Sequence, residues 1–274
     1  MWAEGRSNGL QLIARGVTGT VQRGESEASR TRRWRGDGHH LGEKTSGEKD
    51  HPLRVKEGDS WHFREDKPTW IATKNQIHDL QMQELQEFNE RKNSNDPRYA
   101  SYKGKEQGLP DVGFDGSMTL YLGGLTFVMT AEGRGHSTGD LTVYIPQKRV
   151  FLMGDLLDTE IHPGQGESGE IFFSNVAGWI KILDNIMARN LAVETFVPGH
   201  GPAHIGRGLK DLEEQKRYFV VMRDEVAKMV RDGKSLEQIE KEFKIPAEFA
   251  NYKRPERLRS FYKLFYNQLM ETGY

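Results

Sequence analysis

The chain has 274 residues, of which 35% are hydrophobic and 29% are charged, and its formal net charge is −1 at pH 7. No stretch approaches the roughly 18 consecutive apolar residues of a candidate transmembrane helix, and so small a net charge gives no general attraction to nucleic acid. Because the sequence contains no cysteine, disulfides and thiolate metal sites are excluded. We therefore expect a soluble, cytoplasmic chain with no nucleic-acid or membrane partner.

The beginning of the chain shows little hydrophobic pattern. Residues 20–67 are dominated by Gly, Arg, Glu, Lys and Ser, with no period of 2 or 3.6. Such a composition buries little apolar surface, so we predict that residues 1–67 form an irregular N-terminal segment. Two local exceptions are a strand within residues 10–21 and one apolar face at Trp61 and Phe63. The chain also begins without the apolar core of a signal peptide.

From residue 68 onward the pattern is that of a domain with both strands and helices. After a short strand over 70–72, the hydrophobic period predicts a helix over 75–91, and a polar loop follows over 93–108. Short apolar runs between turn residues then predict four strands, over 118–122, 125–130, 141–145 and 150–153. Gly123-Gly124 and Pro146-Gln147-Lys148 are natural hairpin turns between them.

The remainder of this domain is mostly helical. The sequence predicts an amphipathic helix over 175–189, a strand over 195–197 and a long helix over 209–232. Ser235 and Gln238 have the spacing of a capping box, and Pro255 begins a last helix. The buried face of that helix should hold Leu258, Phe261, Tyr262, Phe265 and Leu269. The fold class is therefore mixed α/β, with one domain over 68–274 that ends in a helical extension over 205–274.

Three glycine-containing segments place metal-capable side chains at strand ends. His136 precedes a predicted strand, whereas Asp155 and His200 each follow one. Glycine lets the backbone turn sharply and leaves room for a ligand, and imidazole and carboxylate groups suit zinc, or iron and manganese. Each residue alone is more often a turn or packing residue. The three together, in this order, predict a metal site.

The same motifs resemble the later motifs of the metallo-β-lactamase superfamily. His136-Ser137-Thr138-Gly139-Asp140, two strands with Gly154-Asp155 after them, and Pro198-Gly199-His200-Gly201 carry the resemblance, which runs from about residue 70 to the end. It implies a four-layer αββα sandwich whose N-terminal half is incomplete here. It also implies that His136 binds one metal ion, that Asp155 bridges two, and that His200 binds the second.

The implied activity is metal-dependent hydrolysis of a small-molecule substrate. The resemblance implies one or two zinc ions, with iron or manganese as alternatives, and a substrate that is an ester, thioester, lactone, β-lactam or phosphoester. The sequence does not choose among these substrates, identifies no catalytic residue beyond the metal ligands, and leaves homo-oligomerisation open.

The chain departs from the family in its first metal motif. The expected His-x-His-x-Asp-His segment, which supplies three more ligands and a catalytic aspartate, is missing. The best positional match is Ser60-Trp61-His62-Phe63-Arg64-Glu65, in which His62 is the only remaining candidate ligand. Arg64 places a cation where the family has a carboxylate, which opposes metal binding. His39, His40 and His51 have the wrong spacing.

Two other histidines are better explained as loop residues than as ligands. His162 lies in the loop after Asp155, and His204 follows His200 by four residues in a turn.

Three interpretations follow from the presence of the later motifs and the loss of the first one. The chain is a metal-dependent hydrolase with impaired activity, or it is a non-catalytic relative that serves as a binding or interaction module. Losing about half of the usual ligands should cost most of the metal affinity, so zinc occupancy is open. The third interpretation is that roughly the first 65 residues are not the native continuation of the domain, through truncation, deletion or an altered reading frame.

Overall fold

The chain folds around a five-stranded sheet. The computed structural model describes residues 69–106, 108–164 and 174–272, together with the backbone of three short strands before them. Four antiparallel strands follow one another and a fifth joins in parallel: β6 (Ser117–Leu122), β7 (Leu125–Gly133), β8 (Asp140–Ile145), β9 (Val150–Asp158) and β10 (Thr195–His200). The order across the sheet is β10-β9-β8-β7-β6, so β9 and β10 lie together at one side.

The two predicted hairpin turns are confirmed. Gly123 and Gly124 link β6 to β7 with φ angles of 59° and 76°. Residues that carry a side chain rarely adopt such positive φ angles. Between β8 and β9, Pro146–Lys148 form one turn of 3₁₀ helix that ends at Arg149 in the left-handed region. These tight turns keep β6 paired with β7, and β8 paired with β9, in antiparallel register.

Two smaller sheets come from the first part of the chain. β4 (Thr69–Thr73) pairs in parallel with β5 (Val112–Phe114) and antiparallel with β1 (Leu12–Ala14). β2 (Arg54–Glu57) and β3 (Ser60–Phe63) form a two-stranded antiparallel sheet, within a range where composition predicted no regular element. The alternation of Trp61 and Phe63 was the local signal for it. The rest of the range 20–67 lies outside the described residues.

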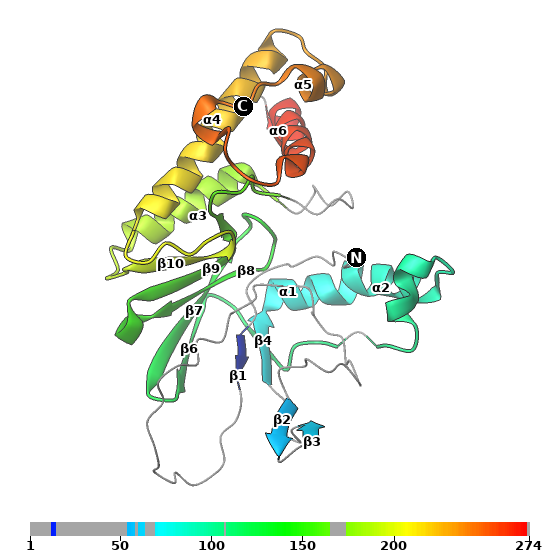
Figure 1. Cartoon of the computed structure of the whole chain (residues 1–274), viewed down its shortest axis with the longest axis vertical. Helices are drawn as coiled ribbons and strands as arrows, with labels where there is room; N and C mark the ends of the chain where they lie inside the picture. The colour runs from blue at the N-terminus through cyan, green and yellow to red at the C-terminus, as the bar shows by residue number, and fades with distance from the viewer. Residues whose placement is uncertain are drawn as a thin grey trace.

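Helices cover the outer faces of the paired sheets (Figure 1). On one side lie α3 (Val176–Ala188), α4 (Lys210–Arg231), α5 (Leu236–Glu242) and α6 (Leu258–Thr272). On the other side, α1 (Lys74–Asp79) follows β4 and continues toward α2 (Leu85–Asn93). This is the helix–sheet–sheet–helix order of the predicted mixed α/β sandwich. Among the described residues, no helix combines the length and apolar character needed to cross a bilayer.

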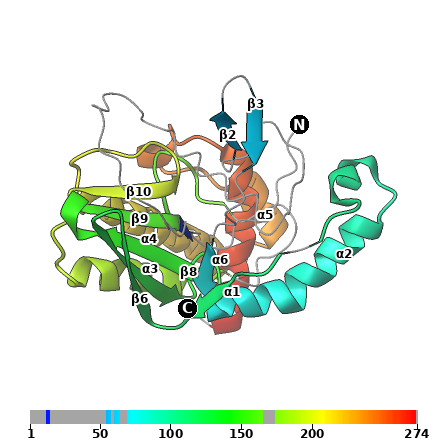
Figure 2. The same ribbon diagram turned by 90° about the horizontal axis from the view of Figure 1, so that it is seen from below.

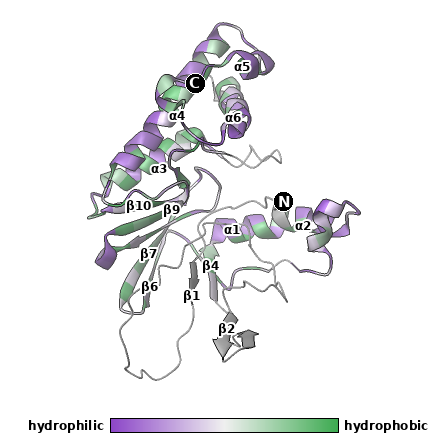
Figure 3. Cartoon of the chain, in the orientation of Figure 1, coloured by the Kyte–Doolittle hydropathy of each residue, from purple (hydrophilic) through white to green (hydrophobic). Residues whose placement is uncertain are grey.

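Two hydrophobic clusters hold these layers together. The larger lies between the sheet and the C-terminal helices and includes Phe151, Phe196, Trp179, Phe219 and Phe261. The smaller lies between the two sheets and consists of Ile71, Phe114, Met129, Leu141 and Val143. Figure 3 shows hydrophobic segments along the large sheet and on α3, α4 and α6. The side of the large sheet that carries β9 and β10 is therefore anchored in the larger cluster.

The predicted helix over 75–91 is present but is not α-helical throughout. A π-helical turn, Leu80–Glu84, separates α1 from α2, and the helical arm extends away from the sheets (Figure 2). The predicted loop that follows contains a 3₁₀ helix, Pro97–Tyr102, which begins at an Asp96 cap.

The predicted helix boundaries near the C-terminus are mostly correct. Ser235 and Gln238 form both bonds of the capping box. Pro255 starts a 3₁₀ turn, Pro255–Arg257, rather than the α-helix itself, which begins at Leu258.

Helix α6 should contribute strongly to stability, because Phe261 is fully buried in the larger cluster. We expect Phe261→Ala to lower the free energy of unfolding by about 3–5 kcal/mol, as for other large-to-small core substitutions. Met270 on the same helix is 62% exposed, so Met270→Ala should change it by less than about 0.5 kcal/mol. Urea unfolding measures both. Equal, small effects would mean that α6 is not part of the cooperative core.

Candidate functional site

Asp155 and His200 come together where β9 pairs with β10. The register of this parallel pair shifts on both sides of Pro198, and such irregularities re-aim side chains at sheet edges. The Nε2 atom of His200 lies 3.5 Å from Oδ1 of Asp155, and the two side chains are 28% and 10% exposed. The Asp155 carboxylate and the His200 imidazole therefore lie close together, and both are partly accessible to solvent.

The positions of both residues differ slightly from the sequence expectation. Asp155 was predicted to follow its strand but lies inside β9, which continues to Asp158. His200 is the last residue of β10, because pairing with β9 continues past Pro198. The sequence suggested strand ends because Gly154 and Gly199 interrupt the apolar runs.

Gly199 makes the approach of the two strands possible. A β-carbon on this residue would overlap Oδ1 of Asp155 and the backbone of Gly154. Any side chain at position 199 would therefore push β10 away from Asp155, and the spacing of the pair depends on glycine here.

His136 lies in a loop that Asp140 organises. The Asp140 carboxylate accepts bonds from the backbone N–H groups of Gly135, His136 and Ser137 at 2.8–2.9 Å, and from Oγ of Ser137 at 2.6 Å. Asp140 is 3% exposed. Burial raises its pKa to about 6, while the neighbouring His136 and the Ser137 and Gly135 donors act to lower it. This carboxylate folds the loop before β8 into a fixed shape.

The His136 ring is held against helix α3. It meets the ring of Trp179 edge-on, with ring centroids 5.4 Å apart and an interplanar angle of 82°. The hydroxyl of Ser174 donates to the His136 carbonyl, and the Asn175 N–H donates to the Gly135 carbonyl at 2.8 Å. The residues at the start of α3 thus also hold this loop.

The structure brings two of the three predicted ligands into direct proximity. Within the described residues, no three His, Asp or Glu side chains cluster closely enough to hold one metal ion. The role of His136 as a third ligand stays a prediction. The side chain of His62 lies outside the described atoms, although its backbone belongs to β3, and His39, His40 and His51 lie outside the described residues.

His162 and His204 are engaged in structural contacts. His162 is fully buried, its Nδ1 lies 2.9 Å from the Tyr218 hydroxyl, and its ring packs against Tyr252. His204 lies between two carboxylates, with Nδ1 2.9 Å from Asp211 and Nε2 3.2 Å from Glu160. Bonds to Asp211 raise the pKa of His204. Both histidines therefore make contacts within the fold, and the expectation that neither binds a metal stays a prediction.

Two functional neighbours were not recognised from the sequence alone. Asp140 is the anchor of the His136 loop, and Trp179 is the surface on which the His136 ring rests. The position of Asp140 four residues after His136, in a glycine-containing turn, was a usable signal for a carboxylate that caps backbone N–H groups. The contact of Trp179 depends on tertiary packing and had no local signal.

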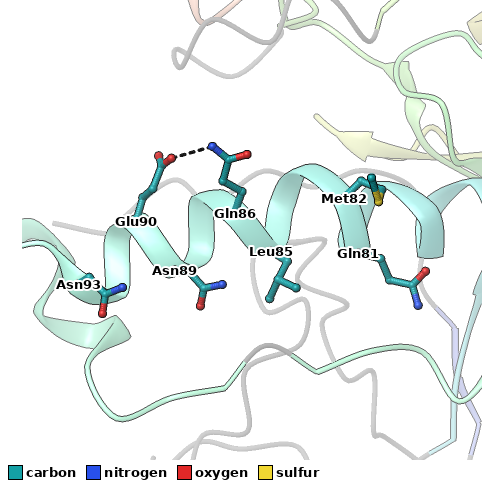
Figure 4. A pocket seen from close by; sticks show the side chains of 7 residues that line it. All are labelled: Gln81, Met82, Leu85, Gln86, Asn89, Glu90 and Asn93. Atoms are coloured by element: carbon teal, nitrogen blue, oxygen red, sulfur yellow. Dashed lines mark hydrogen bonds between the residues drawn. The ribbon is translucent and has the colours of Figure 1, made fainter.

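A separate open groove runs along the helical arm (Figure 4). It has a volume of about 580 Å³ and is lined by Gln81, Met82, Leu85, Gln86, Asn89, Glu90 and Asn93. Its residues include one carboxylate and no histidine, so it offers no alternative metal centre. It shares no residue with the Asp155–His200 pair.

Comparison with known proteins gives a partial match to a curated relative. No protein-family model matches the chain. The metallo-beta-lactamase type 2 of Bacteroides fragilis is 34% identical over 100 residues, which are 35% of this chain and 39% of that protein. The chain thus spans well under half the length of this curated relative.

Solved structures with similar folds were also found. A metallo-beta-lactamase family protein from Thermus thermophilus has a TM-score of 0.49 at 16% identity, covering 74% of this chain and 66% of that one. A stereoselective inverting sec-alkylsulfatase from Pseudomonas sp. has a TM-score of 0.48 at 15% identity, covering 61% of this chain and 28% of that one.

Removing the Asp140 carboxylate should destabilise the His136 loop. We expect Asp140→Ala to lower the free energy of unfolding by about 2–4 kcal/mol, because each buried donor left without an acceptor costs about 1–3 kcal/mol. Asp115 pairs with Lys74 at the surface, where both side chains are more than 60% exposed, so Asp115→Ala should cost less than about 1 kcal/mol. Chemical denaturation compares the two. Equal costs would contradict the anchoring role of Asp140.

His162 should make stability fall in acid. Burial lowers the pKa of His162 to about 4 from an ordinary value of 6.5. The unfolded chain therefore takes up the proton first, and the stability due to this residue is lost as pH falls from about 6.5 to about 4, by up to about 3 kcal/mol. Urea unfolding at pH 7, 5.5 and 4 should show a smaller acid loss in His162→Gln than in the unmodified chain. Parallel losses would show that His162 does not titrate in this way.

Proposed function

We propose that this chain is a metal-dependent hydrolase of the metallo-β-lactamase superfamily, with one weakly held zinc ion and slow turnover; the partial match to a metallo-beta-lactamase supports this. The observation that carries the proposal is the 3.5 Å separation of the Asp155 carboxylate and the His200 imidazole on adjacent strands. A carboxylate oxygen and an imidazole nitrogen are both ordinary zinc donors. The family motifs also imply these two residues as metal ligands, which supports the proposal.

The donor set fits zinc only in part. A catalytic zinc site normally has three protein ligands and one open position, whereas the described residues supply a close pair. When bound, zinc would lower the pKa of a coordinated water and polarise a substrate oxygen. The chain's own contribution is to hold Asp155 and His200 at fixed spacing. His136, steadied by Asp140 and Trp179, is our proposed third ligand.

Slow turnover follows from what the sequence lacks. No His-x-His-x-Asp-His segment occurs anywhere in the chain, so the aspartate that the family uses in catalysis has no counterpart. Arg64, at the nearest matching position, stays protonated at neutral pH and cannot accept a proton from water. We therefore propose hydrolysis that is slow on esters, thioesters, lactones, β-lactams and phosphoesters, with a small molecule as substrate.

A second candidate function is a non-catalytic binding module. The observation in its favour is that the described residues do not gather three metal-capable side chains. In that case the fold would persist while zinc uptake is absent, and Asp155 and His200 would act as a polar pair in a ligand pocket. Metal content separates the two functions directly.

The test is zinc uptake by the purified chain and by two histidine variants. We expect about one zinc ion per chain after incubation and dialysis, measured by elemental analysis. His200→Ala should weaken the zinc affinity, measured by titration calorimetry, by about 10-fold or more, because it removes one of few ligands. His78→Ala is the matched control, since His78 is exposed on α1, and it should leave the affinity unchanged.

Three results would contradict this proposal. An unmodified chain that takes up no zinc would favour the binding module. Equal loss of affinity in both variants would show that zinc binds elsewhere. Rapid, chelator-sensitive hydrolysis of a generic ester or β-lactam would show that the site is complete, with ligands supplied from outside the Asp155–His200 region.

A further inference from the structure

The loop after β9 is joined to the backbone of His200. The N–H of Thr159 donates to the His200 carbonyl at 3.1 Å, and the Thr159 hydroxyl donates to the Pro202 carbonyl at 2.6 Å. Gly201, with a φ of +90°, lies so close that a β-carbon there would overlap the Thr159 carbonyl. The position of His200 therefore depends on where Thr159 is held.

Helix α4 holds this loop through two buried polar side chains. The Oε1 atom of Gln215 accepts from the N–H of Asp158 at 3.3 Å. Three residues further along α4, the Tyr218 hydroxyl lies 2.9 Å from Nδ1 of His162. Gln215 and Tyr218 are 3% and 1% exposed, and residues spaced i, i+3 lie on one face of a helix. That face contacts the loop at both of its ends.

The packing between helix and loop leaves little free space. The cavity between them has a volume of about 10 Å³ and is lined by residues of both, among them Asp158, Thr159 and Gln215. The segment before α6 adds a second restraint, because the His162 N–H donates to the Lys253 carbonyl and the Lys253 N–H donates to the Glu160 carbonyl, each at 2.9 Å. The loop is thus enclosed by the C-terminal extension.

We propose that Gln215 and Tyr218 are positioning residues for the candidate metal ligand His200. Neither Gln215 nor Tyr218 is itself a candidate metal ligand. They fix Asp158 and His162, which bracket Thr159, and Thr159 in turn fixes the backbone of His200. This inference rests on the proposed function, because it assigns the C-terminal helices the task of holding this zinc donor in place.

The experiment compares three variants of the full chain. Tyr218→Phe removes one hydroxyl and keeps the ring, and Gln215→Leu removes the acceptor for the Asp158 N–H. Tyr262→Phe is the matched control, because Tyr262 is also buried, at 6% exposure, and its ring packs on Phe243. Zinc affinity is measured by titration calorimetry, and amide exchange of residues 158–162 is measured by NMR without metal.

Loss of a residue that orients ligands typically weakens metal affinity by about 10–100-fold. We expect about 10-fold weaker zinc binding in Tyr218→Phe and in Gln215→Leu, together with about 10-fold faster exchange of the Thr159 amide, and no change in Tyr262→Phe. Unchanged affinity and exchange in both test variants would overturn the inference while leaving the proposed function intact. Absence of zinc uptake by the unmodified chain would overturn both, and is recognised before any variant is made.

Discussion

The parallel pairing of β9 with β10 is the constraint on which the candidate site depends. Asp155 and His200 are 45 positions apart in the sequence, and this pairing places them 3.5 Å from each other. Parallel neighbours need a long crossover, usually a helix, and α3 supplies it. The apolar side of α3, including Trp179 and Ile182, packs on the sheet. The hydrophobic cluster thus stabilises the crossover, and the crossover allows the polar pair to form.

The same helix connects the third predicted ligand to this edge of the sheet. The indole N–H of Trp179 donates to the carbonyl of Leu156 at 2.9 Å, directly after Asp155 in β9. The ring of Trp179 also meets the His136 ring. One buried side chain therefore contacts both the strand of Asp155 and the loop of His136. A shift of α3 would move this indole and disturb both contacts, so the relative position of Asp155 and His136 depends on how well the indole is packed.

Much of the domain could be predicted from the sequence because its signals are local. The turn at Gly123-Gly124 and the capping box at Ser235 each depend on a few adjacent residues, and both occur as expected. What failed depends on partners distant in sequence. β9 continues through Asp155 because β10 pairs with it, and no local pattern shows that. For the candidate site, residue types and spacing predicted Asp155 and His200, which the structure brings together. The anchoring by Asp140 and α4 became visible only through tertiary contacts.

The three carboxylates of this region, Asp140, Asp155 and Asp158, differ in burial and in their hydrogen-bond partners. Asp140 lies in the motif of His136, but its two oxygens already accept four bonds, so it has no lone pair directed at an ion. Asp158 is 2% exposed in its side chain and lies 3.8 Å from Arg257; burial and the charge of Asp155 raise its pKa well above the usual range. A metal ligand must be ionised and reachable from solvent. Among these three carboxylates, Asp155 combines solvent access with a neighbouring imidazole, and that is why the metal hypothesis rests on it.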